Sequence, residues 1–167
     1  MEEQTSKKID SYLSFKLGDE VFAANVGKVL NILEMTKITK VPKSPEYMKG
    51  VINLRGTVLP LIDTRIKFGM TPTEFSTNTC ILVLDVDVDG ESVHVGALVD
   101  SVQEVLEIDE KEMEPPPSIG NKYKSEFIIG VAKVGEEFIM VLNMDLIFSL
   151  AELIEIKETA SEPSIES

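Results

Sequence analysis

Short stretches of alternating apolar and polar residues recur along the chain, and this period of two predicts β-strands rather than long helices. Turn residues such as Gly18-Asp19 and Asp89-Gly90 separate many of these stretches and favour hairpins. The pattern therefore predicts a mostly β protein. The predicted strands are residues 12–17, 21–24, the end of 25–34, 36–41, 50–54, 57–63, 79–88, 91–95, 127–133 and 137–142.

The stretch 50–63 contains two apolar runs joined at Arg55-Gly56 and predicts a tight hairpin. Gly56 can adopt the positive φ that such a turn requires. Arg55 is then placed at the tip of the hairpin. Its side chain is permanently charged and has five hydrogen-bond donors, and the hairpin holds it rigidly.

Short helical elements are predicted between the strands. Asn25 caps a helical turn, residues 64–69 form an amphipathic helix that ends at Gly69, and a C-terminal helix runs from Asn143 to about Ile156. Residues 70–78 form a polar link, and residues 112–125 form a proline-rich loop. Residues 1–9 and 157–167 are expected to be flexible tails.

The sequence contains a repeat. The pattern Val26-x-x-Val29-x-x-Ile32-Leu33-Glu34 returns as Val99-x-x-Val102-x-x-Val105-Leu106-Glu107, and residues 50–68 align without a gap with residues 130–148. The repeat predicts two similar small β-domains, residues 10–78 and 79–156, which share a buried interface because each is small for independent stability. A chance alignment of two β-rich halves is the alternative.

Composition narrows the possible functions. The formal net charge is −13 and the sequence pI is about 4.5, so no basic face is available for nucleic acid. No apolar run approaches the length of a membrane span, and the polar start resembles no export signal, so we expect a cytoplasmic protein that does not insert into the membrane. The single cysteine, Cys80, lies in an apolar run and is interpreted as a small buried hydrophobe rather than a reactive thiol.

The sequence contains no complete motif for metal binding or catalysis. Asp85, Asp87 and Asp89 imitate the start of a calcium-binding loop, but Gly96 stands where the loop needs a bidentate glutamate. These residues are instead interpreted as the wet face of a strand, and the single His94 is expected at solvent or at a barrel margin. The acids are scattered, and no nucleophile motif or phosphate-binding loop is present, so we expect no metal, no cofactor and no enzyme activity.

Three motifs together resemble one family, the chemotaxis coupling protein CheW. They are Y-L-S-F-K-L-G-D-E from Tyr12, V-P-x-S-P-E-Y-x-x-G-V-I-N-L-R-G-x-V-x-P-L-I-D-T-R-I-K-F from Val41, and V-G-x-L-V-D-S-V-x-E-V-L from Val95. The resemblance extends from about Ser11 to Leu150. It implies an all-β fold with short helices, in which two tandem five-stranded Src-homology-3-like β-barrels pack together.

The resemblance also implies a function, namely a non-catalytic adaptor that couples the cytoplasmic tip of a chemoreceptor to the regulatory domain of the histidine kinase CheA. It implies an apolar receptor groove between the barrels, with Arg55 at its margin. Asn31 stands where many members carry Glu, so the charge is absent there but hydrogen bonding is retained. Ile119, in the proline-rich loop, is the expected kinase contact. The expected groove residues are Leu13, Val26, Val29 and Val102.

Two of these assignments have structural alternatives. Val26 and Val29 are also compatible with barrel core, and Arg55 with a salt bridge to a neighbouring acid. Two other functions also remain open. One is an adaptor of a chemosensory-like pathway with an output other than motility. The other, of a different class, is a small-molecule-binding or hydrolytic β-barrel, which needs an enclosed polar pocket.

Overall fold

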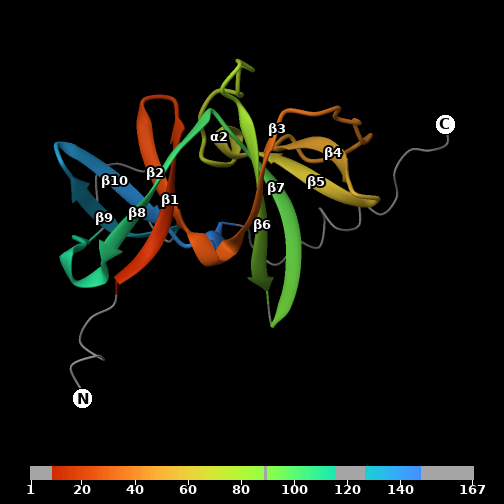
Figure 1. The fold of residues 1–167 in the computed structure, drawn as a ribbon. Coiled ribbons are helices and arrows are strands. Elements are labelled where there is room, and N and C mark those ends of the chain that lie inside the picture. The colour runs from red at the N-terminus through yellow and green to blue at the C-terminus, as the bar shows by residue number, and fades with distance from the viewer. Residues whose placement is uncertain (1–8, 89, 116–126, 148–167) are drawn as a thin grey trace.

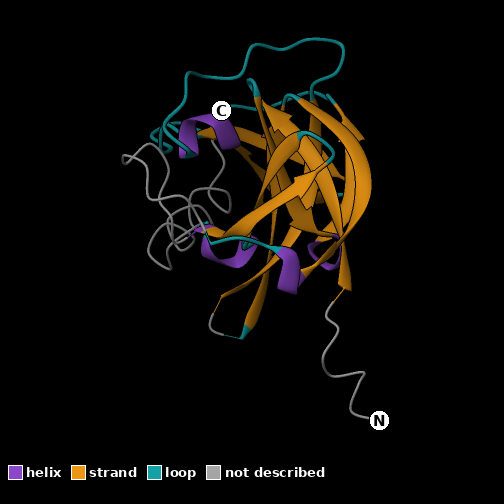
Figure 2. Cartoon of the chain, turned by 90° about the vertical axis from the view of Figure 1, so that its left-hand side faces the viewer, coloured by secondary structure: helices purple, strands orange, loops and turns teal. Residues whose placement is uncertain are grey.

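A computed structural model of the protein describes residues 9–88, 90–115 and 127–147 and shows two five-stranded sheets side by side (Figure 1). Strands make up most of this part of the chain, and the helical elements between them are short (Figure 2). The helical elements are η1 (Val26–Lys28), α2 (Thr64–Lys67), η2 (Glu110–Glu112) and η4 (Met144–Leu146). The strands are β1 (Ile9–Leu17), β2 (Glu20–Asn25), β3 (Val29–Glu34), β4 (Met48–Leu54), β5 (Thr57–Asp63), β6 (Cys80–Val88), β7 (Glu91–Val99), β8 (Ser101–Asp109), β9 (Ile128–Val134) and β10 (Glu137–Leu142).

The two sheets have the same internal order, which confirms the repeat in the sequence. The first sheet runs β8-β1-β2-β10-β9 and the second runs β3-β6-β7-β5-β4. In each sheet one parallel pair joins two hairpins: β2 with β10 joins β1–β2 to β9–β10, and β7 with β5 joins β6–β7 to β4–β5. The fifth strand, β8 or β3, pairs antiparallel with β1 or β6. Each sheet therefore combines the first hairpin of one sequence copy with the last three strands of the other copy.

This exchange of hairpins corrects the predicted domain boundary. A division at residues 78 and 79 separates β5 from β6, although both strands belong to the second sheet. The two units are therefore not tandem segments of the chain: the second sheet is formed by β3 to β7, and the first by β1, β2 and β8 to β10. The repeat gave the order of the strands correctly, but sequence similarity does not reveal which copy a hairpin pairs with.

A short backbone bridge closes each sheet into a barrel, and the predicted all-β class with two five-stranded barrels is confirmed. In barrel B, the second sheet, Thr39 and Val51 exchange hydrogen bonds of 2.9 and 2.8 Å. In barrel A, the first sheet, Glu114 and Val131 do the same at 2.9 and 2.8 Å. The bridge positions follow β3 and β8, which are equivalent strands of the repeat.

The described residues form three hydrophobic clusters, and the largest contains residues of both barrels. Along β6, Ile81 and Val83 face the interior of barrel B, whereas Leu82 and Leu84 face the shared cluster. Along β2, Val21 and the shared-core Phe22 alternate in the same way. Both faces of these strands are buried, which explains why their sequences read as nearly continuous apolar runs.

Several local predictions differ from the structure. Residues 36–41 form only the bridge at Thr39 and not a strand, because Pro42 and Pro45 interrupt the segment that follows. Residues 12–15 are buried on both faces of β1, although their alternation of apolar and polar residues is typical of a strand with one exposed face. Within the predicted C-terminal helix only η4 is described. The rest of that helix, the tails apart from Ile9 and most of the proline-rich loop lie outside the described residues.

A Gly50→Ala substitution tests the bridge that closes barrel B. Gly50 has φ of 149°, and a Cβ there would lie 2.4 Å from the Thr39 carbonyl oxygen, which accepts the Val51 N–H. We expect the free energy of unfolding to fall by about 2 kcal/mol, because the bridge must open or shift. The measurement is the urea midpoint at constant m-value.

The matched control is Gly56→Ala, which has φ of 85° and no heavy atom within 4 Å of the added Cβ. It introduces backbone strain without a clash, and we expect a loss of roughly 1 kcal/mol. Equal losses for the two variants would contradict the assignment of the Gly50 effect to the bridge.

Candidate functional site

Arg55 stands at the tip of the β4–β5 hairpin, as the sequence predicts. Leu54 pairs with Thr57, so Arg55 and Gly56 form a two-residue turn, and both have positive φ, 53° and 85°. The Asn53 side chain accepts the Gly56 N–H at 2.8 Å and braces the turn. A residue with a Cβ in this left-handed region costs roughly 1 kcal/mol. The equivalent position of the second copy is Gly135, with φ of 64°, so glycine holds the strained position there.

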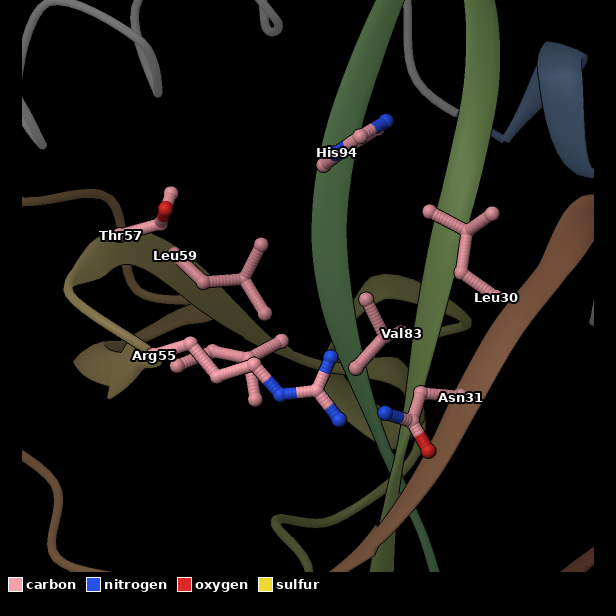
Figure 3. A pocket seen from close by; sticks show the side chains of 8 residues that line it. Leu30, Asn31, Arg55, Thr57, Leu59, Val83 and His94 are labelled. Carbon is pink, nitrogen blue, oxygen red and sulfur yellow. The ribbon is translucent and has the colours of Figure 1, made fainter.

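Beside this tip, the open end of barrel B forms a hollow of about 270 Å³ (Figure 3). Leu59 and Val83 belong to the interior cluster of barrel B, and Leu54 packs against that cluster, so the floor is apolar. The polar groups lie around the mouth. The lining residues are Leu30, Asn31, Leu54, Arg55, Thr57, Leu59, Val83 and His94.

A β-bulge in β3 brings Leu30 and Asn31 to this hollow. Val29 pairs with Leu84 and Asn31 pairs with Val83, so Leu30 is an extra residue in the ladder. Such a bulge redirects the side chains around it. The Asn31 Oδ1 accepts the Ile32 N–H at 2.9 Å, and in Figure 3 its amide nitrogen points toward the Arg55 guanidinium.

The charges around the hollow are unevenly paired. Asp85 accepts a hydrogen bond from the Ser92 hydroxyl and lies 3.9 Å from His94 Nε2. Arg55 is exposed, and within residues 9–88, 90–115 and 127–147 no carboxylate forms an ion pair with it. The alternative interpretation of Arg55 as a partner in an internal salt bridge is therefore not supported by the described residues.

The other predicted receptor residues lie around the shared core and not in the hollow. Leu13 is 5% exposed and belongs to that core. Val29 and Val102 are half-buried and pack against it, whereas Val26, on η1, is 37% exposed. The structure thus separates the predicted residues into an apolar group at the junction of the barrels and the pair Asn31 and Arg55. Ile119 lies outside the described residues.

The sequence analysis expected His94 at solvent or at a barrel margin, and the structure places it in the lining of the hollow. The sequence analysis missed the floor of the hollow. Leu59 and Val83 come from strands that are not paired with each other, and β6 belongs to the other sequence copy. Only the exchange of hairpins brings them to one barrel. The apolar alternation identified these residues as core, but no local signal shows which barrel end they line.

Other candidate chemistry is accounted for by structure. The alternating acids near Asp85 do lie on a strand, with Val86 buried between them and Asp87 exposed. Cys80 is half-buried, and burial raises the pKa of its thiol. Among the described residues, no three His, Cys, Asp or Glu side chains are grouped closely enough to hold a metal ion. None of the helices in this part of the chain has the length and hydropathy needed to cross a bilayer.

Comparisons with known proteins agree on one family. Residues 11–152 match the family model of the CheW-like domain. The probable chemotaxis protein CheW of Rhizobium etli is 34% identical over 84% of this chain and 88% of its own length. Chemotaxis protein CheW of Klebsiella aerogenes is 31% identical over 85% and 83%. The crystal structure of the scaffolding protein TtCheW from Thermoanaerobacter tengcongensis is similar, with a TM-score of 0.75 and 30% identity over 87% of this chain and 91% of that chain.

Proposed function

Because this chain belongs to the family of CheW-like domains, whose members are non-catalytic chemotaxis scaffolding proteins, we propose that it couples chemoreceptors to a histidine kinase. In this proposal one surface binds the cytoplasmic tip of a receptor and another binds the regulatory domain of the kinase CheA. The protein acts in the cytoplasm and is recruited to receptor arrays. Individually weak contacts would gain strength there through multivalency.

The proposal of receptor binding is supported mainly by the backbone conformation and the exposed charge of Arg55. This arginine occupies a backbone conformation that costs about 1 kcal/mol, although glycine takes the equivalent place in barrel A. It has no acidic partner among the described residues and stands at an exposed tip. Strain at an exposed, unpaired charge favours a role in binding over a role in maintaining the fold.

The proposed receptor surface combines this charged tip with an apolar margin. Val26 is accessible, and Val29 and Val102 are partly so, which suits the apolar face of a receptor helix. Leu13 is buried beneath them and would shape the surface without touching the partner. Asn31 supplies hydrogen bonds beside Arg55. The proposed kinase contact, Ile119, lies outside the described residues and has no structural argument.

The proposal is tested by capture on the immobilised full chain. A receptor cytoplasmic fragment and a kinase regulatory domain are applied separately and then together. Retention of both, with one not displacing the other, is the expected result. Failure to retain either one would reject the coupling function.

An Arg55→Glu variant is expected to bind the receptor fragment at least about tenfold more weakly and to bind the kinase domain unchanged, because the tip would repel the group that it now attracts. The measurement is Kd by calorimetry at two salt concentrations. Lys133→Glu is the matched control: it makes the same charge change beside the β9–β10 tip of barrel A, where we expect receptor binding to stay within about twofold. Equal losses would trace the effect to net charge and not to the site.

A further inference from the structure

The turn η1, which carries the exposed Val26 of the proposed receptor surface, has no buried residue of its own. Polar contacts hold it: the Asn25 side chain accepts the Gly27 N–H at 2.8 Å, and Lys28 Nζ lies 2.9 Å from Asp145 Oδ2. We propose that η1 switches between this turn, which presents Val26 to the receptor, and an added length of β3, which withdraws it. Asp145 holds the turn. The inference rests on the proposed receptor binding and names a means of regulating it.

Asp145 belongs to a firmly anchored element. It lies in η4, whose Met144 and the adjacent Ile147 are each 3% exposed and belong to the shared core. Asn143 caps η4, because its side chain accepts the Asp145 N–H at 3.0 Å. In Figure 1 this blue turn lies beside the orange turn η1. A fixed carboxylate at the end of barrel A therefore holds a turn of barrel B that has no buried anchor.

Asp145 also occupies the edge of β6 that a longer β3 would need. β3 pairs with β6 only as far as Val29 opposite Leu84, whereas β6 continues beyond this pair with β7 on its other side. The Asp87 N–H, in this overhang, donates to Asp145 Oδ1 at 2.8 Å. At the register of Val29 with Leu84, a longer β3 would bring Val26 opposite Asp87. The contact with Asp145 thus stands where the ladder would continue.

Barrel A contains the longer ladder in the equivalent place. By the sequence repeat, Lys28 corresponds to Ser101 and Gly27 to Asp100. Ser101 belongs to β8 and pairs with Lys16 of β1, and the Asp100 N–H donates to the Lys16 carbonyl oxygen at 3.1 Å. The same fold therefore accommodates strand pairing at the position where barrel B has a turn.

The two barrels differ in the residue that supplies the carboxylate. When the ladders are aligned by their register, Gly18 of barrel A takes the place of Asp87. The Gly18 N–H donates to Asp100 Oδ2 at 2.7 Å, so the carboxylate comes from within the connection to β8. Gly27 has no side chain for this role, and in barrel B the carboxylate comes from Asp145. The length of the barrel B ladder therefore depends on a contact from another element.

Lys28 has an acidic partner in both arrangements. In the turn it binds Asp145, and in a longer β3 it would lie opposite Asp85, where opposite charges across a ladder attract each other. Val26 would then lie on the same face as Lys28 and leave the junction of the barrels. Because each arrangement has its own ion pair and backbone hydrogen bonds, a change at Asp145 is sufficient to shift their populations.

The test compares Asp145→Ala with Lys28→Ala in the full chain by nuclear magnetic resonance. Asp145→Ala removes the carboxylate that holds the turn. The Cα shifts of residues 26–28 should move toward strand values, and cross-strand contacts should appear between residues 26–28 and 85–87. Lys28→Ala removes the ion pair of both arrangements but keeps the bond to Asp87, so η1 should keep its shifts. Binding of the receptor fragment should weaken about fivefold for Asp145→Ala and stay within about twofold for Lys28→Ala.

The shifts are measured without a receptor, so they separate this inference from the proposed function. Unchanged shifts in Asp145→Ala overturn the switch, and random-coil shifts without contacts to β6 overturn it too, because Asp145 would then be a simple anchor. Strand shifts with undiminished receptor affinity overturn the regulation of binding. Absence of receptor binding by the parent protein overturns the coupling function, and the shifts still decide on the switch.

If Asp145→Ala does not fold, Asp145→Asn is the second variant. It keeps an oxygen for the Asp87 N–H but frees Lys28 to pair with Asp85. The same cross-strand contacts should therefore appear at lower intensity, and their absence in a folded Asp145→Asn rejects the inference.

Discussion

An Asp63→Ala variant is expected to lose about 4 kcal/mol of unfolding free energy, because one buried carboxylate organises the end of β5. Asp63 is fully buried, and its Oδ1 accepts the Arg65 N–H at 3.1 Å and the Thr73 hydroxyl at 2.8 Å. Its Oδ2 accepts the Thr73 N–H at 3.1 Å and lies 3.8 Å from Lys49 Nζ. Alanine leaves these donors without an acceptor and also uncaps α2. The urea midpoint at constant m-value measures the loss.

Two controls divide the expected loss into its parts. Asp63→Asn keeps an oxygen for the cap, as Asn143 does at the equivalent place of barrel A, where it accepts the Asp145 N–H at 3.0 Å. It also puts an amide nitrogen near one of the Thr73 donors, so we expect an intermediate loss of about 2 kcal/mol. Thr73→Val removes only the hydroxyl contact and should cost roughly 1 kcal/mol. An alanine variant no less stable than the asparagine variant would contradict this account.

Local signals in the sequence were sufficient for most individual elements. Alternating apolar residues and Gly-containing turns gave nearly all the strands, and the Asn25 side chain does accept the Gly27 N–H and cap η1. These features depend on neighbours within a few residues, which the sequence displays directly. The strand predicted at residues 36–41 is absent because a strand also needs a partner strand to pair with. Local β propensity cannot show whether such a partner is present.

The exchange of hairpins was beyond local reasoning. The two copies have similar strands, so β1–β2 has no property that assigns it to β8 and β10 instead of β3 and β5. The choice is made by packing: Phe15 and Phe22 of the first hairpin and Leu82 and Leu84 of the second all contribute to one shared cluster. A repeat therefore predicts the order of strands within a barrel but not their partners.

In the candidate site, too, the sequence predicts local features but not contacts between distant segments. Arg55 was found because a two-residue turn between apolar runs is a local feature. Its conformational cost became visible only from its φ of 53° in the structure and from the comparison with Gly135. The Asn31 amide lies near Arg55 because of a bulge in β3. No sequence pattern in residues 29–34 predicts this bulge.

The two barrels are held together by related charged clasps. In the Arg65–Asp100 clasp, an acid at the junction of β7 and β8 binds Arg65 after β5 and accepts the Gly18 N–H at 2.7 Å. In the Lys28–Asp145 clasp, Asp145 after β10 lies 2.9 Å from Lys28 and accepts the Asp87 N–H at 2.8 Å. Arg65 and Asp145 occupy equivalent places in the repeat with opposite charges. Each clasp crosses between barrels where the chain passes from one sheet to the other.

Asp100→Asn is expected to cost about 3 kcal/mol at neutral pH, since it leaves a half-buried Arg65 without its ionic partner. Arg65 contacts both carboxylate oxygens, through Nε at 3.0 Å and Nη2 at 2.6 Å. Partial burial pulls the pKa of Asp100 upward, but the hydrogen bonds from Arg65 and Gly18 together outweigh it, and the pKa lies below its ordinary value. The stabilisation is therefore complete well above the unfolded value of 3.8 and is lost as pH falls below it through the folded pKa.

The measurement is the difference in unfolding free energy between the parent protein and Asp100→Asn, followed from pH 7 into the acid range. The difference should stay constant near neutrality and shrink once the pH drops below about 4, because only the parent protein then takes up a proton at this position. Lys28→Ala is the control at the equivalent clasp. Lys28 and Asp145 are more exposed than Arg65 and Asp100 and are joined by one contact. We therefore expect Lys28→Ala to lower the free energy of unfolding by less than about 1 kcal/mol. A difference that does not change with pH would show that Asp100→Asn acts through packing and not through the charge of the clasp.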